Sequence, residues 1–123
     1  MVALMSTCFH SMHCYFFDSY LAHYLTTQFQ LTQSGVGLAF SGFGLGLAMS
    51  GVIASLTLAV LSPISTIVVG LLLTGFCTMM IGPSAVLGFS KSLTLTYSGL
   101  FSSGMFSGLI FTPTYGEINN ESK

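Results

Sequence analysis

Charged residues are nearly missing from this sequence. Asp, Glu, Lys and Arg together make up 4% of its 123 residues, whereas an ordinary soluble domain has about a quarter. No charged residue lies between Asp18 and Lys91. A soluble protein covers its surface with polar groups, and this chain has too few of them. The composition excludes an ordinary soluble domain, and a hydrophobic content of 52% excludes disorder.

Several motifs of known chemistry are also missing. The net charge is -1 and no basic cluster occurs, so we expect no nucleic-acid partner. Neither G-x-S-x-G nor H-E-x-x-H is present, so we expect no enzyme activity. The stretch GFGLGLAMSG has Leu47 where a dinucleotide fingerprint needs its third glycine, so we expect no nucleotide cofactor.

The cysteines and the first residues predict little processing or cross-linking. The three cysteines form no C-x-x-C pair, and their odd number argues against a disulfide framework. We expect them to be buried apolar side chains. The opening MVALMSTCFHSMH lacks a basic region and a small-residue cleavage site, so a cleaved signal peptide is not expected.

The apolar residues that dominate the chain are grouped into four segments. A helix that crosses the hydrocarbon core of a bilayer, which is about 30 Å thick, needs about 20 apolar residues. A membrane β-barrel is excluded because STIVVGLLLTGFCTMMIG is apolar on every side rather than alternating. The sequence therefore predicts an all-α, multi-pass membrane protein surrounded by a lipid bilayer, with a polar loop around Lys91. The four spans are expected at about 4–26, 36–56, 64–81 and 93–111.

Small residues recur every four positions in three of these segments. The rows are Gly42, Gly46, Ser50 and Ala54; Gly70, Thr74, Thr78 and Gly82; Gly104, Gly108 and Thr112; and Gly99, Ser103 and Ser107. Helices in lipid associate through close backbone approach, because burying leucine against leucine gains nothing there. The rows therefore predict a compact helix bundle. The residues expected at its helix contacts are Gly42, Gly46, Ser50, Gly104 and Gly108.

Asp18 is the carboxylate inside an apolar segment. A charged side chain at the centre of a bilayer costs about 3 kcal/mol, so it usually faces a polar cavity, holds a partner or takes a proton. His10 and Cys14 precede it at four-residue steps on the same helix face. This line could form a proton or cation site, or Asp18 could lie near a helix end. No metal site is expected, because the line extends over about 12 Å of helix.

Three stretches of the chain resemble the major facilitator superfamily in their order. They are FFDSYLAHYLTTQFQLTQSGVGLAF, GLLLTGFCTMMIGPSAVL and SGMFSGLIFTPTYGEI. The closest likeness is to the vesicular amine transporter family, especially its polyamine-transporting branch. The motifs are an acid with leucine three positions on (Asp18, Leu21), V-G-L at 36–38, I-G-P at 81–83 and P-T-x-x-E-I at 113–118.

This resemblance implies helices seven to ten of a twelve-helix transporter, whose tenth helix Pro113 and Glu117 close on the cytosolic side. Family members exchange luminal protons for cytosolic amines. The resemblance therefore implies proton-coupled antiport of organic cations such as polyamines, with Asp18 and Glu117 as candidate coupling residues. His10 is a third candidate, because it shares the helix face of Asp18. The resemblance also implies the remaining transporter helices as partners, and a secretory or synaptic-type vesicle membrane as the location.

The chain departs from this family pattern in two places. The loop ASLTLAVLSPIS has no charge where members carry a G-x-x-x-D-K/R motif, which puts normal gating in doubt. Gly108 stands where monoamine transporters have an acid, which favours the polyamine branch or another substrate. A small four-helix membrane scaffold or partner subunit without transport activity is the alternative. It explains the composition and the small-residue rows equally well, but not the order of the motifs.

Overall fold

The computed structural model describes residues 2–81 and 92–121, which form four helices. These are α1 (Val2–Gln28), α2 (Gln33–Leu58), α3 (Pro63–Ile81) and α4 (Leu93–Glu121). No strand occurs in this part of the chain, so the prediction of an all-α fold is confirmed there. Each helix covers one of the predicted spans. The expected polar loop around Lys91 and the Gly82-Pro83 turn lie outside the described residues.

Local signals in the sequence set the starts of α2 and α3. Thr32 caps α2, with its side-chain Oγ1 accepting a hydrogen bond from the backbone N–H of Gly35 at 3.4 Å. Pro63 is the first residue of α3, a position where proline loses no helical hydrogen bond. The Ser62 hydroxyl just before it accepts the N–H of Ser65 at 3.4 Å. The two connections are therefore short turns, and α1, α2 and α3 alternate in direction.

The end of α4 differs from the sequence prediction. The helix was expected to end near residue 111, with Pro113 as its breaker, but it continues through Pro113 to Glu121. Proline removes one N–H from the helix, which leaves the carbonyl of Leu109 without its usual donor. Both Pro113 and Thr114 are buried, and the Thr114 hydroxyl donates to the Ile110 carbonyl at 2.6 Å. This hydroxyl bond goes to Ile110 and not to the freed Leu109 carbonyl, so the helix is maintained through Pro113 by the packing of the buried segment.

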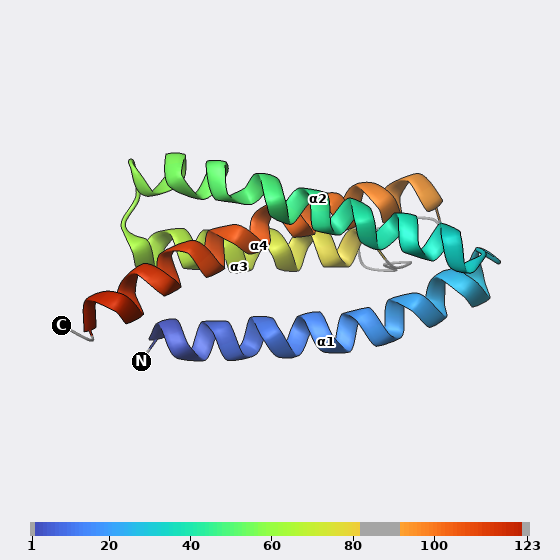
Figure 1. Cartoon of the computed structure of the whole chain (residues 1–123), viewed down its shortest axis with the longest axis horizontal. Coiled ribbons are helices and arrows are strands. Elements are labelled where there is room, and N and C mark those ends of the chain that lie inside the picture. Colours follow the sequence, from blue (N-terminus) through green and yellow to red (C-terminus); the bar gives the residue numbers. More distant parts are fainter. Residues whose placement is uncertain (1, 82–91, 122–123) are drawn as a thin grey trace.

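α4 occupies the centre of the bundle. It packs mainly against α2 and α3 and makes fewer contacts with α1. Figure 1 shows α4 running between α2 and α3, with α1 along the outside, and the two chain ends at the same end of the bundle. At the opposite end α1 joins the others through a hydrophobic cluster. Its buried members are Leu21, Leu25, Ala39, Ile81 and Leu100.

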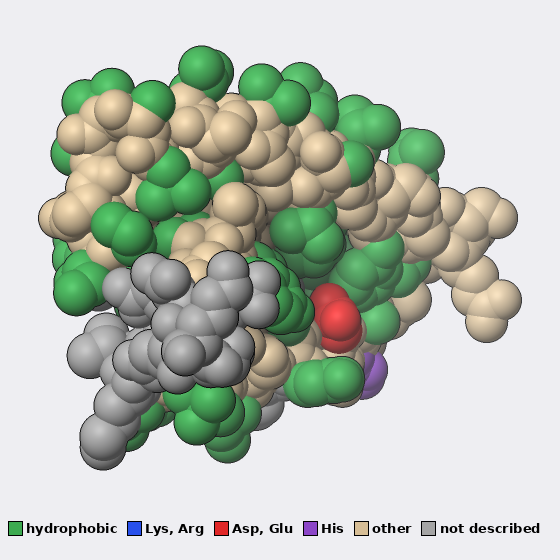
Figure 2. All heavy atoms as spheres, turned by 60° about the vertical axis from the view of Figure 1, so that its left-hand side comes forward, with side chains coloured by type: hydrophobic (Ala, Val, Ile, Leu, Met, Phe, Trp, Pro, Cys, Tyr) green, Lys and Arg blue, Asp and Glu red, His purple; other side chains and the backbone are tan. Residues whose placement is uncertain are grey.

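Elsewhere the interior is built largely from small and hydroxyl-bearing residues, and large apolar side chains lie on the outside. Buried positions include Ala39, Gly46, Ser50, Ala54, Thr66, Gly70, Thr74, Thr96, Ser103, Gly104, Ser107 and Thr114. Exposed ones include Leu38, Leu45, Val52, Leu56, Leu72 and Phe76. Figure 2 shows hydrophobic side chains spread over the outer surface on one face of the molecule. Water would favour the reverse arrangement, whereas helices in lipid pack through small residues.

Two of the described helices are long and apolar enough to cross a membrane, judged by length and composition. They are α2, with a mean hydropathy of 1.8, and α3, with 2.2. The rest of the described helices are more polar, because α1 contains three histidines and Asp18, and α4 is rich in serine, threonine and glycine. Four transmembrane helices therefore stay a prediction.

Candidate functional site

Glycines bring the backbones of α2 and α4 into close contact. A Cβ atom on Gly46 would overlap the carbonyl oxygen of Phe101 and lie 3.0 Å from the backbone nitrogen of Met105. The contact is reciprocal, because a Cβ on Gly104 would overlap the carbonyl oxygen of Phe43. Only glycine fits at these two positions without moving a backbone.

The other small residues of these rows are not all at the helix contact: Gly108 lies in it and Gly42 does not. A Cβ on Gly108 would overlap the side chain of Ser50, so these two residues also lie in the interface. Gly42, expected at the same contact, has no neighbouring atom within 4 Å. Four residues turn an α-helix by about 400°, so a row at four-residue spacing drifts by about 40° per step. The buried face of α2 follows Ala39 and Gly46 instead, and Gly42 falls outside it.

Three polar side chains gather on α1. The Sγ of Cys14 lies 3.6 Å from the Nε2 of His10, and the rings of His10 and His13 stack with centroids 6.2 Å apart. His10 is 3% exposed, and its ring packs edge-on against Phe111 of α4, with centroids 4.8 Å apart. His13 and Cys14 are half-buried. One buried imidazole thus connects the polar face of α1 to α4.

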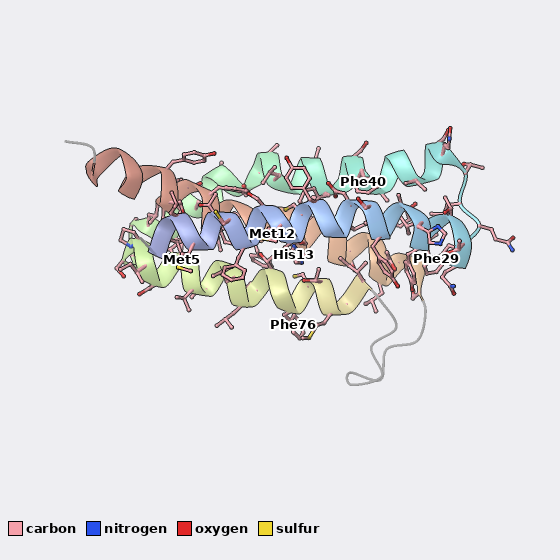
Figure 3. The ribbon with its side chains drawn as sticks, turned by 90° about the horizontal axis from the view of Figure 1, so that it is seen from below. Met5, Met12, His13, Phe29, Phe40 and Phe76 are labelled. Carbon is pink, nitrogen blue, oxygen red and sulfur yellow. The ribbon has the colours of Figure 1, made fainter. Side chains whose placement is uncertain are left out.

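A cavity of about 260 Å³ lies between this face and α3. Its lining residues are Phe9, His10, His13, Leu71, Thr74 and Gly75. Figure 3 shows His13 midway along α1, between the ribbons of α1 and α3. Apart from the two imidazoles, the accessible lining is apolar. The cavity is therefore a small, mostly apolar space with a few convergent polar groups.

Thr74 is the exception among the buried hydroxyls. Most of them bond a carbonyl one turn back in their own helix: Ser107 donates to Ser103 at 2.8 Å, for example, and Thr114 to Ile110 at 2.6 Å. Thr74 is 4% exposed, and within residues 2–81 and 92–121 its Oγ1 is the buried side-chain oxygen that has no hydrogen-bond partner. An unpaired buried hydroxyl costs about 1–3 kcal/mol. This oxygen is enclosed by the protein, so it is not part of the accessible lining of the cavity.

The three candidate coupling residues do not form one site. Asp18 is exposed on α1, two turns beyond His10. Glu117 lies in the last turns of α4, and its side chain is outside the described part. α1 and α4 are antiparallel, and His10 contacts Phe111, so Asp18 is displaced from this level by about 12 Å in one direction and Glu117 by about 9 Å in the other. The backbone positions of Asp18 and Glu117 are therefore about 20 Å apart along the bundle.

His13 and Thr74 are the residues of this region that sequence reasoning did not single out as functional. His13 follows His10 by three positions and precedes Cys14, so helical periodicity alone could have placed the three on one face. Thr74 appeared in a row of small residues, but its unpaired hydroxyl depends on how α3 packs against α1. Sequence reasoning weighed His10, Cys14 and Asp18 as metal ligands and expected no metal site. In the structure it is His13, rather than Asp18, that lies close to His10 and Cys14.

Comparisons with known proteins give one informative match. No protein-family model matches the chain, and no solved structure matches it. The chain is 32% identical over 116 residues to the human MFS-type transporter SLC18B1. The aligned region is 93% of this chain and 24% of the transporter. The chain resembles one quarter of a transporter.

This similarity runs through all four helices and supports a segment of a major facilitator transporter, which is a helical membrane protein. The apolar outer surface of the bundle and its interior of small residues are consistent with that environment. The chain spans about a quarter of the length of the curated relative that it matches. The activity of a whole transporter is therefore a matter of proposal for this chain.

Proposed function

We propose that the chain forms helices seven to ten of a major facilitator transporter and contributes part of its transport path. The observation that carries this proposal is the 32% identity over 93% of the chain to a human MFS-type transporter. A small scaffold of four helices needs no such similarity. The close α2–α4 contact at Gly46 and Gly104 supports a segment that packs as a unit within the larger protein.

The transport mode we propose is proton-coupled antiport of organic cations such as polyamines, across a vesicle membrane. Support comes from Asp18, an exposed carboxylate on a helix that is otherwise apolar or neutral. A carboxylate at membrane depth needs a counter-charge or a proton. Asp18 would hold a proton in one conformation of the transporter and an organic cation in the other, so its charge would be compensated in both conformations.

His10 and Glu117 have different positions in this proposal. His10 is buried against Phe111 and close to Cys14, so it would act inside the bundle. Asp18 is exposed toward the space that the remaining helices of the transporter would cover. Glu117, about 20 Å away along the bundle, would act at the opposite end of the path. We therefore assign the cation contact to Asp18 and a separate proton-carrying role to His10, about 12 Å away along α1.

A chimera tests this function. This chain would replace the matching quarter of the human transporter, and uptake of radiolabelled spermidine into acidified proteoliposomes would be measured. We expect proton-dependent uptake by the chimera and its loss in Asp18→Asn, because asparagine keeps the size and hydrogen bonds of the side chain without its charge. His23→Gln, an exposed histidine of the same helix, is the matched control and should keep uptake.

The amount of folded chimera is measured in parallel by gel filtration, so that misfolding is separated from lost transport. A folded chimera that carries no organic cation would contradict the transport segment. Full uptake by the Asp18→Asn form would instead remove Asp18 from the coupling step.

A further inference from the structure

We propose that His10, His13 and Cys14 bind a divalent transition-metal ion of the zinc class. Their ligand atoms all lie within 4.8 Å of one another, and the Cys14 Sγ and His10 Nε2 are 3.6 Å apart. In a tetrahedral zinc site, bonds of about 2.1–2.3 Å place neighbouring ligand atoms about 3.5 Å apart. One pair already has this spacing. The widest pair needs to close by about 1 Å, which small side-chain rotations can provide.

The ligand types and their positions select the metal. The three residues occupy positions i, i+3 and i+4 of α1 and therefore share one helix face. Imidazole and thiolate are the ligands that zinc prefers, whereas magnesium and calcium require oxygen ligands. The helix fixes the three side chains relative to one another, and the adjoining cavity gives an ion a way in.

The cavity beside the three ligands can hold a fourth ligand of the metal. Zinc sites with three protein ligands keep a water in the fourth position. The cavity of about 260 Å³ beside His10 and His13 has room for such a water.

The local charges balance a divalent ion. When the metal–sulfur bond forms, the Cys14 thiol releases its proton to solvent and becomes a thiolate. Asp18 lies one helical turn beyond Cys14, so its carboxylate is close enough to compensate charge. The ion carries +2, and the thiolate and the carboxylate carry -1 each, which sums to zero. Asp18 is not a ligand, because it lies about 12 Å along the helix from His10.

The three ligands lie on α1, so the site is tested without transport. A metal ion on His10 would block the proton-carrying role proposed for this residue, so the two roles belong to different states of the protein. The probe is Co²⁺, added to the full 123-residue chain, without a histidine tag, in detergent micelles. We expect one Co²⁺ per chain, with a sulfur-to-cobalt charge-transfer absorption that Zn²⁺ abolishes. Cys14→Ser should lose this absorption, and His13→Gln should weaken Co²⁺ binding by about tenfold or more.

Matched controls come from the same helix. Cys8→Ser and His23→Gln change the same residue types at exposed positions and should leave Co²⁺ binding unchanged. His10 is buried, so the half-buried His13 and Cys14 carry the test if the His10→Gln variant does not fold. The proposal is overturned if the natural chain binds Co²⁺ no more tightly than the Cys14→Ser variant. Loss of the charge-transfer absorption in Cys8→Ser would overturn it too.

Discussion

Replacement of Gly46 by alanine should loosen the centre of the bundle. The added Cβ would overlap the Phe101 carbonyl oxygen and lie 3.0 Å from the backbone nitrogen of Met105. Backbone atoms cannot rotate away as a side chain can, so α2 and α4 must move apart. The same movement weakens the reciprocal contact at Gly104, where a Cβ would overlap Phe43. Overpacking of this kind costs about 1–3 kcal/mol of the free energy of unfolding.

The matched control is Gly42→Ala in the same helix, because a Cβ at Gly42 meets no atom within 4 Å. Alanine favours a helix over glycine by up to about 1 kcal/mol, and this gain is common to both variants. We therefore expect Gly42→Ala to be neutral or slightly stabilising and Gly46→Ala to be less stable than it by about 1–3 kcal/mol. Gly46→Leu should be worse than Gly46→Ala.

Unfolding by SDS in mixed micelles, followed by near-ultraviolet circular dichroism of tyrosine, measures these differences. Tyr97 of α4 is a suitable reporter because its hydroxyl donates to the Gly35 carbonyl of α2 at 3.3 Å. The double variant with Gly104→Ala should lose less than the sum of the single changes, since one separation of the helices relieves both overlaps. Equal stability of Gly46→Ala and Gly42→Ala would refute the close contact.

Two further predictions concern the α1 end of the bundle and a bond between α3 and α4. Leu25→Ala, at a side chain that is 0% exposed, should lower the free energy of unfolding by about 1–2 kcal/mol in the same SDS titration, which is less than in water because lipid also solvates leucine. Leu45→Ala, at a side chain that is 60% exposed, is the control and should change stability little. Equal losses in the two variants would contradict the buried hydrophobic cluster around Leu25. The buried Thr96 hydroxyl shares its proton between the Ile81 carbonyl of α3 at 3.2 Å and the Ser92 carbonyl one turn back at 3.0 Å. Thr96→Val removes both bonds and should cost about 0.6 kcal/mol in the same titration, and no measurable loss would mean that this hydroxyl does not stabilise the bundle.

The sequence predicted the helices well because each apolar run is bounded by a strong local signal, such as Thr32 before α2 or Pro63 at the start of α3. It missed the length of α4. Proline ends a helix when only local rules apply, but the burial of Pro113 and Thr114 keeps the helix intact beyond Pro113. That outcome depends on neighbouring helices, which a local pattern does not contain.

The candidate site was less accessible from the sequence. The row through Gly42 was expected at a helix contact, yet the drift of four-residue steps and the crossing of α2 over α4 leave it open. The shared helix face of His10, Cys14 and Asp18 could be predicted from their four-residue spacing. Helical periodicity alone groups His13 with His10, whereas the burial of the unpaired Thr74 hydroxyl depends on how α3 packs in the bundle. Periodicity places residues on a face, but tertiary packing decides what that face meets.

The central claim is that all four helices cross a bilayer as a transporter segment, and cysteine labelling tests it most directly. Single cysteines at Val2, Gln30, Leu61, Lys91 and Lys123, in a chain without its natural cysteines, would be labelled in liposomes by a membrane-impermeant maleimide. Four crossings predict that positions 2, 61 and 123 react on one side of the membrane and positions 30 and 91 on the other. Labelling of positions 2 and 30 from the same side would show that α1 does not cross, and would contradict the account.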